Sequence, residues 1–391
     1  MSNKPRFVGE KVRLGDVCKA SSLRNKDESC NAVYSVTNSQ GFVPSEEYFS
    51  KEVYSKDLKT YRVVDRDMIA YNPSRINVGS VALQNKAERV VVSPLYVVFS
   101  TDSSRLLPDY LVQFLKSKPG LVQIAFQSIG TVRNNLKFKA MCQMELTLPP
   151  VEVQHKRLQK LDSICGQINH AKEAIEKLDQ LVKSRFVEMF GTADCPPAEF
   201  PVSTIGEVCD SVIRGPFGSA LKKSFFVPKG DDTYKVYEQK HAIQRRSDIG
   251  TYYITANKYE ELKRFECFPG DILMSCSGTM GKLYQLPQDC ERGVMNQALC
   301  KFKLGNSILP DYFFGFMEQV VDDLGAKGSG IKNVSSVKFI KAIKIPLPPI
   351  KVQLDFAAFA AQVDKSRFVA QQQIEKLQML YDSLAQDYFG D

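Results

Sequence analysis

The chain contains one passage twice, and this duplication restricts its possible folds more than any other feature. A Leu-Pro-Pro triplet followed by a long polar segment occurs at Leu148–Pro150 and again at Leu347–Pro349, 199 residues later. The two copies stay in register to their ends, where "MFGT" at Met189 matches "YFGD" at Tyr388. Self-similarity at about half the length of the chain predicts two similar structural units that arose by tandem duplication.

The similarity also extends upstream of the prolines. "LLPDY" at Leu106 matches "ILPDY" at Ile308, and "DRDMIAYNPSRINVGSVAL" at Asp65 matches "PGDILMSCSGTMGKLYQL" at Pro269. The offset varies between these matches, so the two copies differ by insertions and deletions in their variable parts. Each unit is therefore expected to hold a complete set of loops of its own.

Each unit shows the same coarse order of elements. Strand-like apolar runs are followed by a short helix after Leu-Pro-Asp-Tyr and by an apolar strand that ends at the two prolines, because proline can neither donate to a sheet ladder nor continue a helix interior. The pattern predicts an α+β protein with two mixed α/β domains, each followed by a long helix. The expected boundaries are 1–148 and 193–346 for the two domains, and 149–192 and 347–391 for the two helices.

The two long segments carry apolar residues at helical spacing. The stripes step by three or four residues and consist of Leu161, Ile164, Ile168, Ala171, Ile175, Leu178, Val182, Phe186 and Met189 in the first copy, and of Ala360, Val363, Arg367, Ala370, Ile374, Leu377, Tyr381, Ala385 and Tyr388 in the second. Two arrangements are open: independent surface helices, or an antiparallel coiled coil. We favour the coiled coil, because a narrow stripe on a charged helix suits another helix better than a sheet. Arg367 is the one charged residue in either stripe.

Composition excludes several classes of protein. With 43% hydrophobic and 25% charged residues the chain is typical of a globular protein, and no apolar run approaches the roughly 18 residues of a membrane span. Since the first residues also lack the apolar core of a signal peptide, we expect a cytoplasmic protein with no membrane contact. The ten cysteines form no C-x-x-C pair and there are only three histidines, so no metal site is expected. The net charge of +8 permits an anionic partner without requiring one.

Catalytic signatures are missing. "SGTMGKL" at Ser277 lacks the leading glycine and the hydroxyl residue of a phosphate loop, and "YNPSRI" at Tyr71 lacks the second proline of an amino-methyltransferase tetrapeptide. The chain also lacks a G-x-S-x-G elbow and an H-E-x-x-H motif. We therefore expect no catalytic residues and no cofactor-binding residues in this chain.

The repeated loops instead carry residues suited to DNA contact. Arginine, lysine, asparagine and hydroxyl side chains surround glycines there, where backbone N–H groups approach phosphates and longer side chains reach a groove. The alternatives are tight turns whose glycine and asparagine serve only backbone geometry, and charge runs that are solvated faces. The candidate DNA-binding residues are Arg75, Asn77, Arg133, Asn134, Arg214, Lys222, Lys223, Lys240, Arg245, Arg246, Ser277, Thr279, Lys282, Lys332 and Asn333.

These phrases, in this order, resemble the specificity subunits of type I restriction-modification enzymes over nearly the whole chain. The phrases that carry the resemblance are "YNPSRINVGS", "IRGPFGSALK", "PGDILMSCSGTMGK" and "GIKNVSSVKFIKAIKIPLPPIKVQ". The resemblance implies a subunit without activity of its own that reads a bipartite, asymmetric site in double-stranded DNA, one half-site per recognition domain. It also implies that the helices set the half-site spacing and dock two modification (methyltransferase) subunits, and that restriction/translocase subunits join this core.

Cofactors follow from the same resemblance. S-adenosylmethionine and ATP/Mg are expected on the partner subunits and none in this chain. Two other functions stay open from the sequence: a recognition subunit of a related modification system with other catalytic partners, and a coiled-coil scaffold that binds two proteins without specific DNA recognition.

Overall fold

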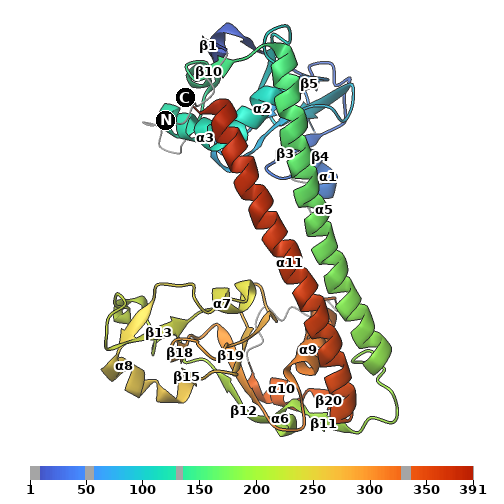
Figure 1. Ribbon diagram of the computed structural model, residues 1–391, viewed down its shortest axis with the longest axis vertical. Coiled ribbons are helices and arrows are strands. Elements are labelled where there is room, and N and C mark those ends of the chain that lie inside the picture. The colour runs from blue at the N-terminus through green and yellow to red at the C-terminus, as the bar shows by residue number, and fades with distance from the viewer. Residues whose placement is uncertain (1–8, 49–56, 129–134, 327–335, 391) are drawn as a thin grey trace, which may run out of the picture. The chain divides into compact units, whose positions relative to one another are not determined.

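The computed structural model describes residues 9–48, 57–128, 135–326 and 336–390 (Figure 1). The chain forms two compact units: unit 1 comprises residues 1–173 and 370–391, and unit 2 comprises residues 174–369. Both predicted long helices are present, α5 at Val151–Phe190 and α11 at Ile350–Phe389. Each unit contains one half of each long helix, so each unit combines residues from both copies of the repeat.

The described part of unit 1 contains short strands and four short helices besides its segments of the long helices. Its main sheet has four strands in the order β2-β9-β6-β7, and β1-β10, β3-β4 and β5-β8 form two-stranded pairs. The strands are β1 (Glu10–Arg13), β2 (Cys18–Ala20), β3 (Tyr34–Thr37), β4 (Gly41–Pro44), β5 (Arg62–Asp65), β6 (Ile69–Tyr71), β7 (Val81–Leu83), β8 (Arg89–Val92), β9 (Val97–Thr101) and β10 (Glu145–Leu148). The helices are α1 (Ser45–Tyr48), α2 (Pro108–Lys116), α3 (Lys118–Gln127) and α4 (Phe138–Met141), with 3-10 turns at Leu14–Asp16 and Ile76–Val78.

Among its described residues, unit 2 contains two four-stranded sheets, β12-β19-β16-β17 and β14-β13-β18-β15, and the pair β11-β20. Its strands are β11 (Val202–Thr204), β12 (Cys209–Arg214), β13 (Thr233–Tyr237), β14 (Tyr253–Thr255), β15 (Glu266–Cys267), β16 (Ile272–Ser275), β17 (Leu283–Gln285), β18 (Gly293–Met295), β19 (Leu299–Leu304) and β20 (Lys344–Pro346). Its helices are α6 (Ile205–Val208), α7 (Gln239–Gln244), α8 (Ala256–Glu261), α9 (Pro310–Ala326) and α10 (Val337–Ala342), with 3-10 turns at Lys223–Phe225 and Lys263–Phe265.

The two units share a frame, as the duplication predicts. The order β2-β9-β6-β7 of unit 1 is the order β12-β19-β16-β17 of unit 2, and in both units the first strand pairs antiparallel with the strand before the prolines. Both Leu-Pro-Asp-Tyr motifs begin helices, α2 and α9, at their proline. The predicted α+β fold with two related domains is confirmed.

A buried glutamine fixes the start of each long helix. Gln154 accepts a hydrogen bond from the Leu107 backbone N–H (2.9 Å), and its amide group donates to the carbonyl oxygens of Arg105 (2.7 Å) and Pro149 (2.9 Å). Gln353, at the same place in the second copy, makes the same three bonds to Leu309 (2.8 Å), Ser307 (3.1 Å) and Pro348 (2.8 Å). Neither side chain is exposed, so the proline stop, the long helix and the Leu-Pro-Asp-Tyr helix are joined by one fully satisfied amide.

The two long helices pack against each other as antiparallel segments within each unit. In unit 1 the core contains Leu158 and Leu161 from the start of α5 and Phe389 from the end of α11. In unit 2 the core contains Phe186 from the end of α5 and Phe356 from the start of α11. Every predicted stripe residue is buried or half-buried, and within each unit the two helix segments share one core, as the coiled-coil prediction requires.

Arg367 interrupts the stripe but is neutralised. Its guanidinium group is bound by Asp179 of α5 at 2.5 Å and by Asp364 one turn earlier on α11. Arg367 therefore forms an interhelical ion pair in unit 2 and is not an unpaired buried charge.

Candidate nucleic-acid interface

The β6–β7 hairpin of unit 1 presents Arg75 and Asn77, and both are exposed. The other polar residues of this hairpin hold the turn: Ser80 donates to the Val36 carbonyl (2.7 Å), and Asn72 accepts from the Ser74 N–H (3.0 Å). Gly79 has φ +90°, a conformation that favours glycine. The two interpretations left open by the sequence thus apply to different residues of one loop, because the small residues shape the backbone while Arg75 and Asn77 face solvent.

The β16–β17 hairpin is the equivalent loop of unit 2. Ser275 donates to the Thr279 carbonyl (2.7 Å) and accepts from the Lys282 N–H (3.0 Å), which ties the two ends of the turn together. Gly281 has φ +76°, and a Cβ there would lie 2.3 Å from Val321, so no other residue fits. Thr279 and Lys282 are exposed and Ser277 is half-buried.

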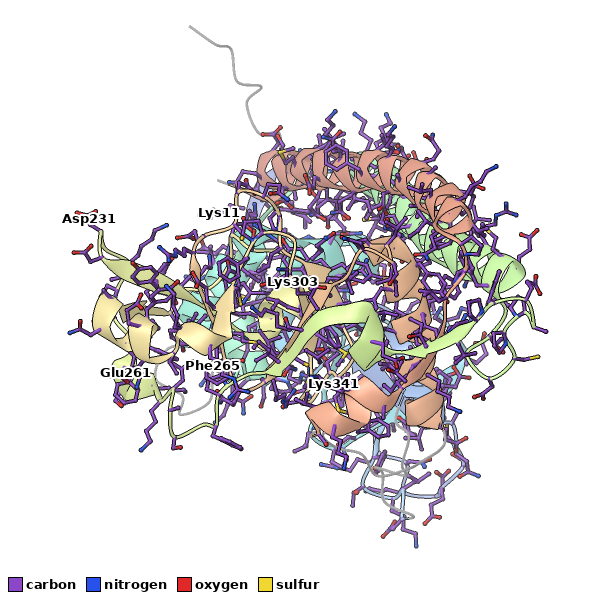
Figure 2. All side chains as sticks on the ribbon, turned by 90° about the horizontal axis from the view of Figure 1, so that it is seen from below. Lys11, Asp231, Glu261, Phe265, Lys303 and Lys341 are labelled. Atoms are coloured by element: carbon purple, nitrogen blue, oxygen red, sulfur yellow. The ribbon has the colours of Figure 1, made fainter. Side chains whose placement is uncertain are left out.

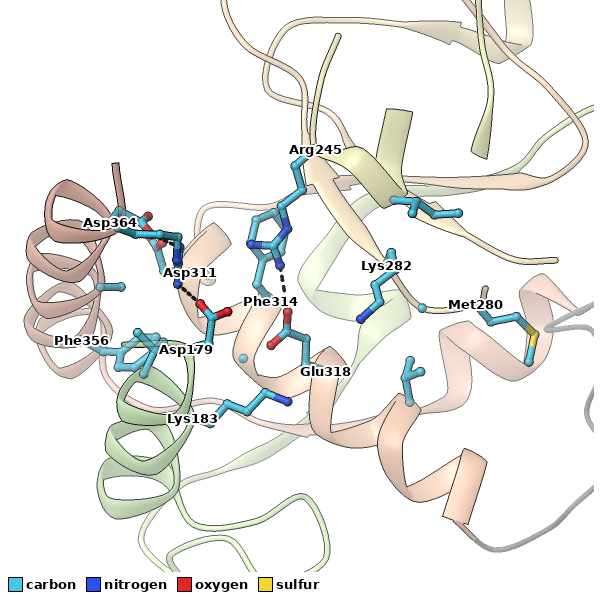
Figure 3. A pocket seen from close by; sticks show the side chains of 17 residues that line it. Asp179, Lys183, Arg245, Met280, Lys282, Asp311, Phe314, Glu318, Phe356 and Asp364 are labelled. Atoms are coloured by element: carbon cyan, nitrogen blue, oxygen red, sulfur yellow. Dashed lines mark hydrogen bonds and ion pairs between the residues drawn. The ribbon is translucent and has the colours of Figure 1, made fainter. Parts of the chain in front are cut away.

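Lys282 and Arg245 line one cleft of unit 2, of about 440 Å³, which Figure 3 shows from close by. Arg245 follows α7 with φ +50° and donates to Glu318 of α9 at 3.0 Å. Lys183 of α5 lies on the same cleft, and the three cations surround Glu318 in Figure 3. Residues predicted from two distant loops are therefore brought together, whereas no sequence pattern pointed to Lys183 or Glu318.

Charges in this cleft are balanced. The cations are Lys183, Arg245, Lys282 and Arg367, and the carboxylates are Asp179, Asp311, Glu318 and Asp364. Burial raises the pKa of the Asp311 carboxyl, and the neighbouring Asp364 adds to the increase. The cleft has no excess of positive charge with which to attract a phosphate. A ligand that displaces Glu318 from Arg245 would allow the guanidinium to donate to the ligand instead.

The remaining candidates of unit 2 are dispersed. Lys222 and Lys223 are exposed at the 3-10 turn after β12. Lys240 is paired with Glu238 at 2.6 Å, and Arg246 forms a two-bond pair with Asp248 at 2.9 and 2.5 Å. Surface ion pairs of this kind contribute little to stability, so they do not by themselves explain why these cations are present.

Arg214 differs from the other candidates because it is half-buried at the end of β12. Its Nη1 atom is buried without a hydrogen-bond partner, which points to a place inside the unit rather than on a free surface. Four further candidates, Arg133, Asn134, Lys332 and Asn333, lie outside the described residues.

The described part of the chain shows neither a cluster of metal ligands nor a membrane-spanning helix. Within residues 9–48, 57–128, 135–326 and 336–390, no three His, Cys, Asp or Glu side chains gather as metal ligands would. Over the same ranges none of the helices is long and apolar enough to cross a membrane.

Known proteins share this architecture. A family model described as "Type I restriction modification DNA specificity domain" matches residues 9–180 and 197–379, one match for each copy of the repeat. A protein of Methanocaldococcus jannaschii with the provisional name type I restriction enzyme MjaX specificity subunit is 23% identical over 331 residues, which cover 81% of this chain and 76% of that protein.

Solved structures agree at the level of the fold. A chain from a study of complex assembly and conformational transition in the type I R-M system has a TM-score of 0.58 at 17% identity, and all of both chains is covered. The type I restriction-modification S subunit from M. genitalium has a TM-score of 0.50 at 14% identity, with 100% of this chain and 98% of that chain covered.

The chain belongs to the family of type I restriction modification DNA specificity domains, because the family model covers most of both repeats. Members of this family are the DNA-recognising, non-catalytic specificity subunits of restriction-modification enzymes, which work with methyltransferase and restriction subunits. The predictions of the family and of a chain that is not itself an enzyme are confirmed.

Proposed function

We propose that this chain reads a bipartite, asymmetric sequence in double-stranded DNA, with one half-site bound by each unit. The two units share the same strand order but carry different exposed side chains in equivalent loops. The hairpin between the third and fourth strands of the shared sheet order presents Arg75 and Asn77 in unit 1 but Thr279 and Lys282 in unit 2. Equivalent loops with different donors and acceptors are what two different half-sites require.

We further propose that the chain docks two modification subunits and, with them, restriction/translocase subunits. One pair of exposed apolar residues supports two equivalent protein contacts: Leu181 of α5 and Leu380 of α11 occupy the same position of the repeat, and each is 48% exposed. S-adenosylmethionine and ATP/Mg would be bound by those partners. The family assignment favours DNA recognition over the alternative of a scaffold without DNA affinity.

Single substitutions in the two hairpins test the DNA proposal in the complex with the modification subunits. Arg75→Ala should weaken binding to DNA through the half-site of unit 1 alone, and Lys282→Ala through the half-site of unit 2 alone. A lost phosphate contact reduces the salt slope of binding by about one, whereas a lost base contact costs about 1–3 kcal/mol at one position of the site. Methylation of DNA libraries at several salt concentrations measures both effects.

A matched control removes the same charge elsewhere in unit 2. Lys341, labelled in Figure 2, is exposed near the end of α10 and was not predicted to touch DNA. Lys341→Ala should leave the salt slope and both half-site preferences unchanged. If Arg75→Ala and Lys282→Ala behaved like this control, the hairpins would be solvated turns and the proposed readers would be wrong.

A further inference from the structure

Unit 2 contains a second cleft, of about 700 Å³, on the face of its main sheet that carries Lys301 and Lys303. Lys301 and Asp271 form an ion pair at 3.1 Å on its wall, and their side chains are only 6% and 4% exposed. The Lys301 ammonium also donates to the Glu266 carbonyl at 2.5 Å. The loss of hydration of two buried charges opposes their mutual attraction, so a buried pair is weak evidence for a stability role.

The shared frame shows that the fold does not need these charges. The strand pairings place Ile272 opposite Phe302 in unit 2 and Ile69 opposite Phe99 in unit 1. By that register, the positions of Asp271, Lys301 and Gln285 are taken in unit 1 by Met68, Val98 and Leu83. The same sheet is thus built with apolar side chains at all three positions, and the polar wall is a property of unit 2 alone.

The mouth of the cleft joins an aromatic ring with cations. Phe268 is 51% exposed, and the Lys301 ammonium lies 5.4 Å from its ring centroid. Arg264 is exposed and makes no ion pair within the described residues, and Lys303 (Figure 2) has only Asp210 at 3.9 Å, with both side chains more than half exposed. Lys263 and Glu266 also line the cleft, but they are bonded to each other and to Tyr259.

Each feature suits one part of a nucleotide. An exposed ring offers a face on which a base stacks, and Arg264 and Lys303 offer charge to a phosphate. Gln285 donates to the Gly270 carbonyl at 3.3 Å with one amide hydrogen, so its carbonyl oxygen and second hydrogen can meet the edge of a base. With four cations and two carboxylates on its lining, the cleft carries an excess of two positive charges.

We propose that this cleft of unit 2 binds a nucleoside phosphate, with the base on Phe268 and the phosphate at the rim that carries Arg264 and Lys303. The nucleotide is either free in solution or an unstacked residue of a single DNA strand, since both present the same base and phosphate.

Calorimetric titration of the full chain distinguishes the two sources. ATP and a hexamer of deoxyadenylate are titrated separately into the wild type, Phe268→Ala and Lys303→Glu. We expect saturable binding of one nucleotide per chain, weakened at least about tenfold by either substitution, because one stack or one phosphate contact is lost. Binding of ATP assigns the cleft to free nucleotides, and binding of the hexamer alone assigns it to a DNA strand.

Two control variants match the tested residues. Phe217, at 89% exposure, is another exposed phenylalanine of unit 2 outside the cleft, so Phe217→Ala should bind like the wild type, and so should Lys341→Glu. Absence of saturable binding of either probe at millimolar concentration would overturn the proposal, as would equal losses in the controls. Phe268→Ala should leave half-site reading by the complex intact; loss of that reading together with nucleotide binding would place Phe268 in the duplex interface and overturn a separate site.

Discussion

The ends of the long helices pack at equivalent positions in the two units, but the side chains that contact them differ. In unit 2 the ring of Phe356 packs against Phe186 and Phe190 at 5.4 and 5.5 Å between centroids. In unit 1 the position of Phe356 is taken by Arg157, which lies 4.7 Å from the Tyr388 ring centroid and donates to the Tyr388 carbonyl at 3.1 Å. Both helix ends pack against aromatic rings, since Phe389 of unit 1 lies 5.0 Å from Tyr110 and 5.8 Å from Phe114, but at the position of Phe356 unit 1 has a cation instead of a ring.

Neighbouring positions change together with this one. Phe186 of unit 2 corresponds to Ala385 of unit 1, and Gly315 corresponds to Gln113. A Cβ at Gly315 would lie 2.2 Å from the Phe186 ring, whereas Gln113 fills that place in unit 1 and accepts from the Tyr381 hydroxyl at 2.6 Å. The two copies of the repeat thus share a backbone frame but differ in whole sets of contacting side chains, which makes each site specific for its own helix end.

The largest loss of stability is expected when Phe356 of unit 2 is replaced by arginine, the residue at the equivalent position of unit 1. Phe356→Arg removes a ring that is 1% exposed and places a cation in the core of unit 2, where Met189 stands at the position of the Tyr388 ring that Arg157 contacts in unit 1. We expect the free energy of unfolding to fall by about 3–5 kcal/mol. Urea denaturation followed by circular dichroism measures it. Phe356→Leu, which keeps the site apolar, should cost clearly less, and equal costs would show that the aromatic set is not specific.

Removing the buried glutamine at the start of either long helix should lower the free energy of unfolding by an intermediate amount that is the same in both units. Gln154→Ala and Gln353→Ala each leave one backbone N–H and two carbonyls without their side-chain partner in a buried place. The expected loss is about 1–3 kcal/mol for each, with the two values within a few tenths of each other. Thermal and urea unfolding of the two variants side by side measure the difference. A large difference would mean that the two glutamines make the same hydrogen bonds but contribute unequally to the stability of their units.

The smallest expected effect is a difference in acid sensitivity. Among the described residues, all fully buried charged side chains belong to unit 2: Lys235, Glu266, Asp271 and Lys301. Burial opposes ionisation of the nearby Glu291 carboxyl, but hydrogen bonds and charge from Lys229 and Lys235 outweigh it and lower the pKa of Glu291 to about 2. A folded pKa below the ordinary 4.5 contributes stability that is present above pH 4.5 and is lost as the pH falls toward 2.

After discounting for solvent screening of this partly exposed carboxyl, the loss at pH 4 is well under about 1 kcal/mol. Hydrogen exchange followed by mass spectrometry should show peptides of β13 and β18 opening earlier than the sheet of unit 1 as the pH falls from 5 to 3. Glu291→Gln should be less stable at neutral pH, because Lys235 stays buried without its carboxylate, and should show a flatter acid dependence. Equal acid sensitivity of both units would contradict this account.

Much of the fold followed from local patterns. The two proline stops, the long helices and the helices after Leu-Pro-Asp-Tyr were predicted because proline chemistry and a periodic apolar stripe act within a few residues of the chain. The repeat predicted a common sheet before any strand pairing was known. In the candidate interface, the sequence indicated which residue types lie in the hairpins, and Arg75, Asn77, Thr279 and Lys282 are indeed exposed there.

Two related units, each with a proline stop, a common sheet and a long helix, can be deduced from the residues alone. The contacts between distant elements become visible only in the folded chain: the end of each helix packs into the core of the unit built from the other copy, and Arg245 and Lys282 share one cleft with Lys183. In the folded chain Lys301 and Asp271 also form a buried pair where unit 1 has apolar side chains. These contacts join residues far apart in the chain, and their formation depends on the packing of whole elements, which no local pattern of residues encodes.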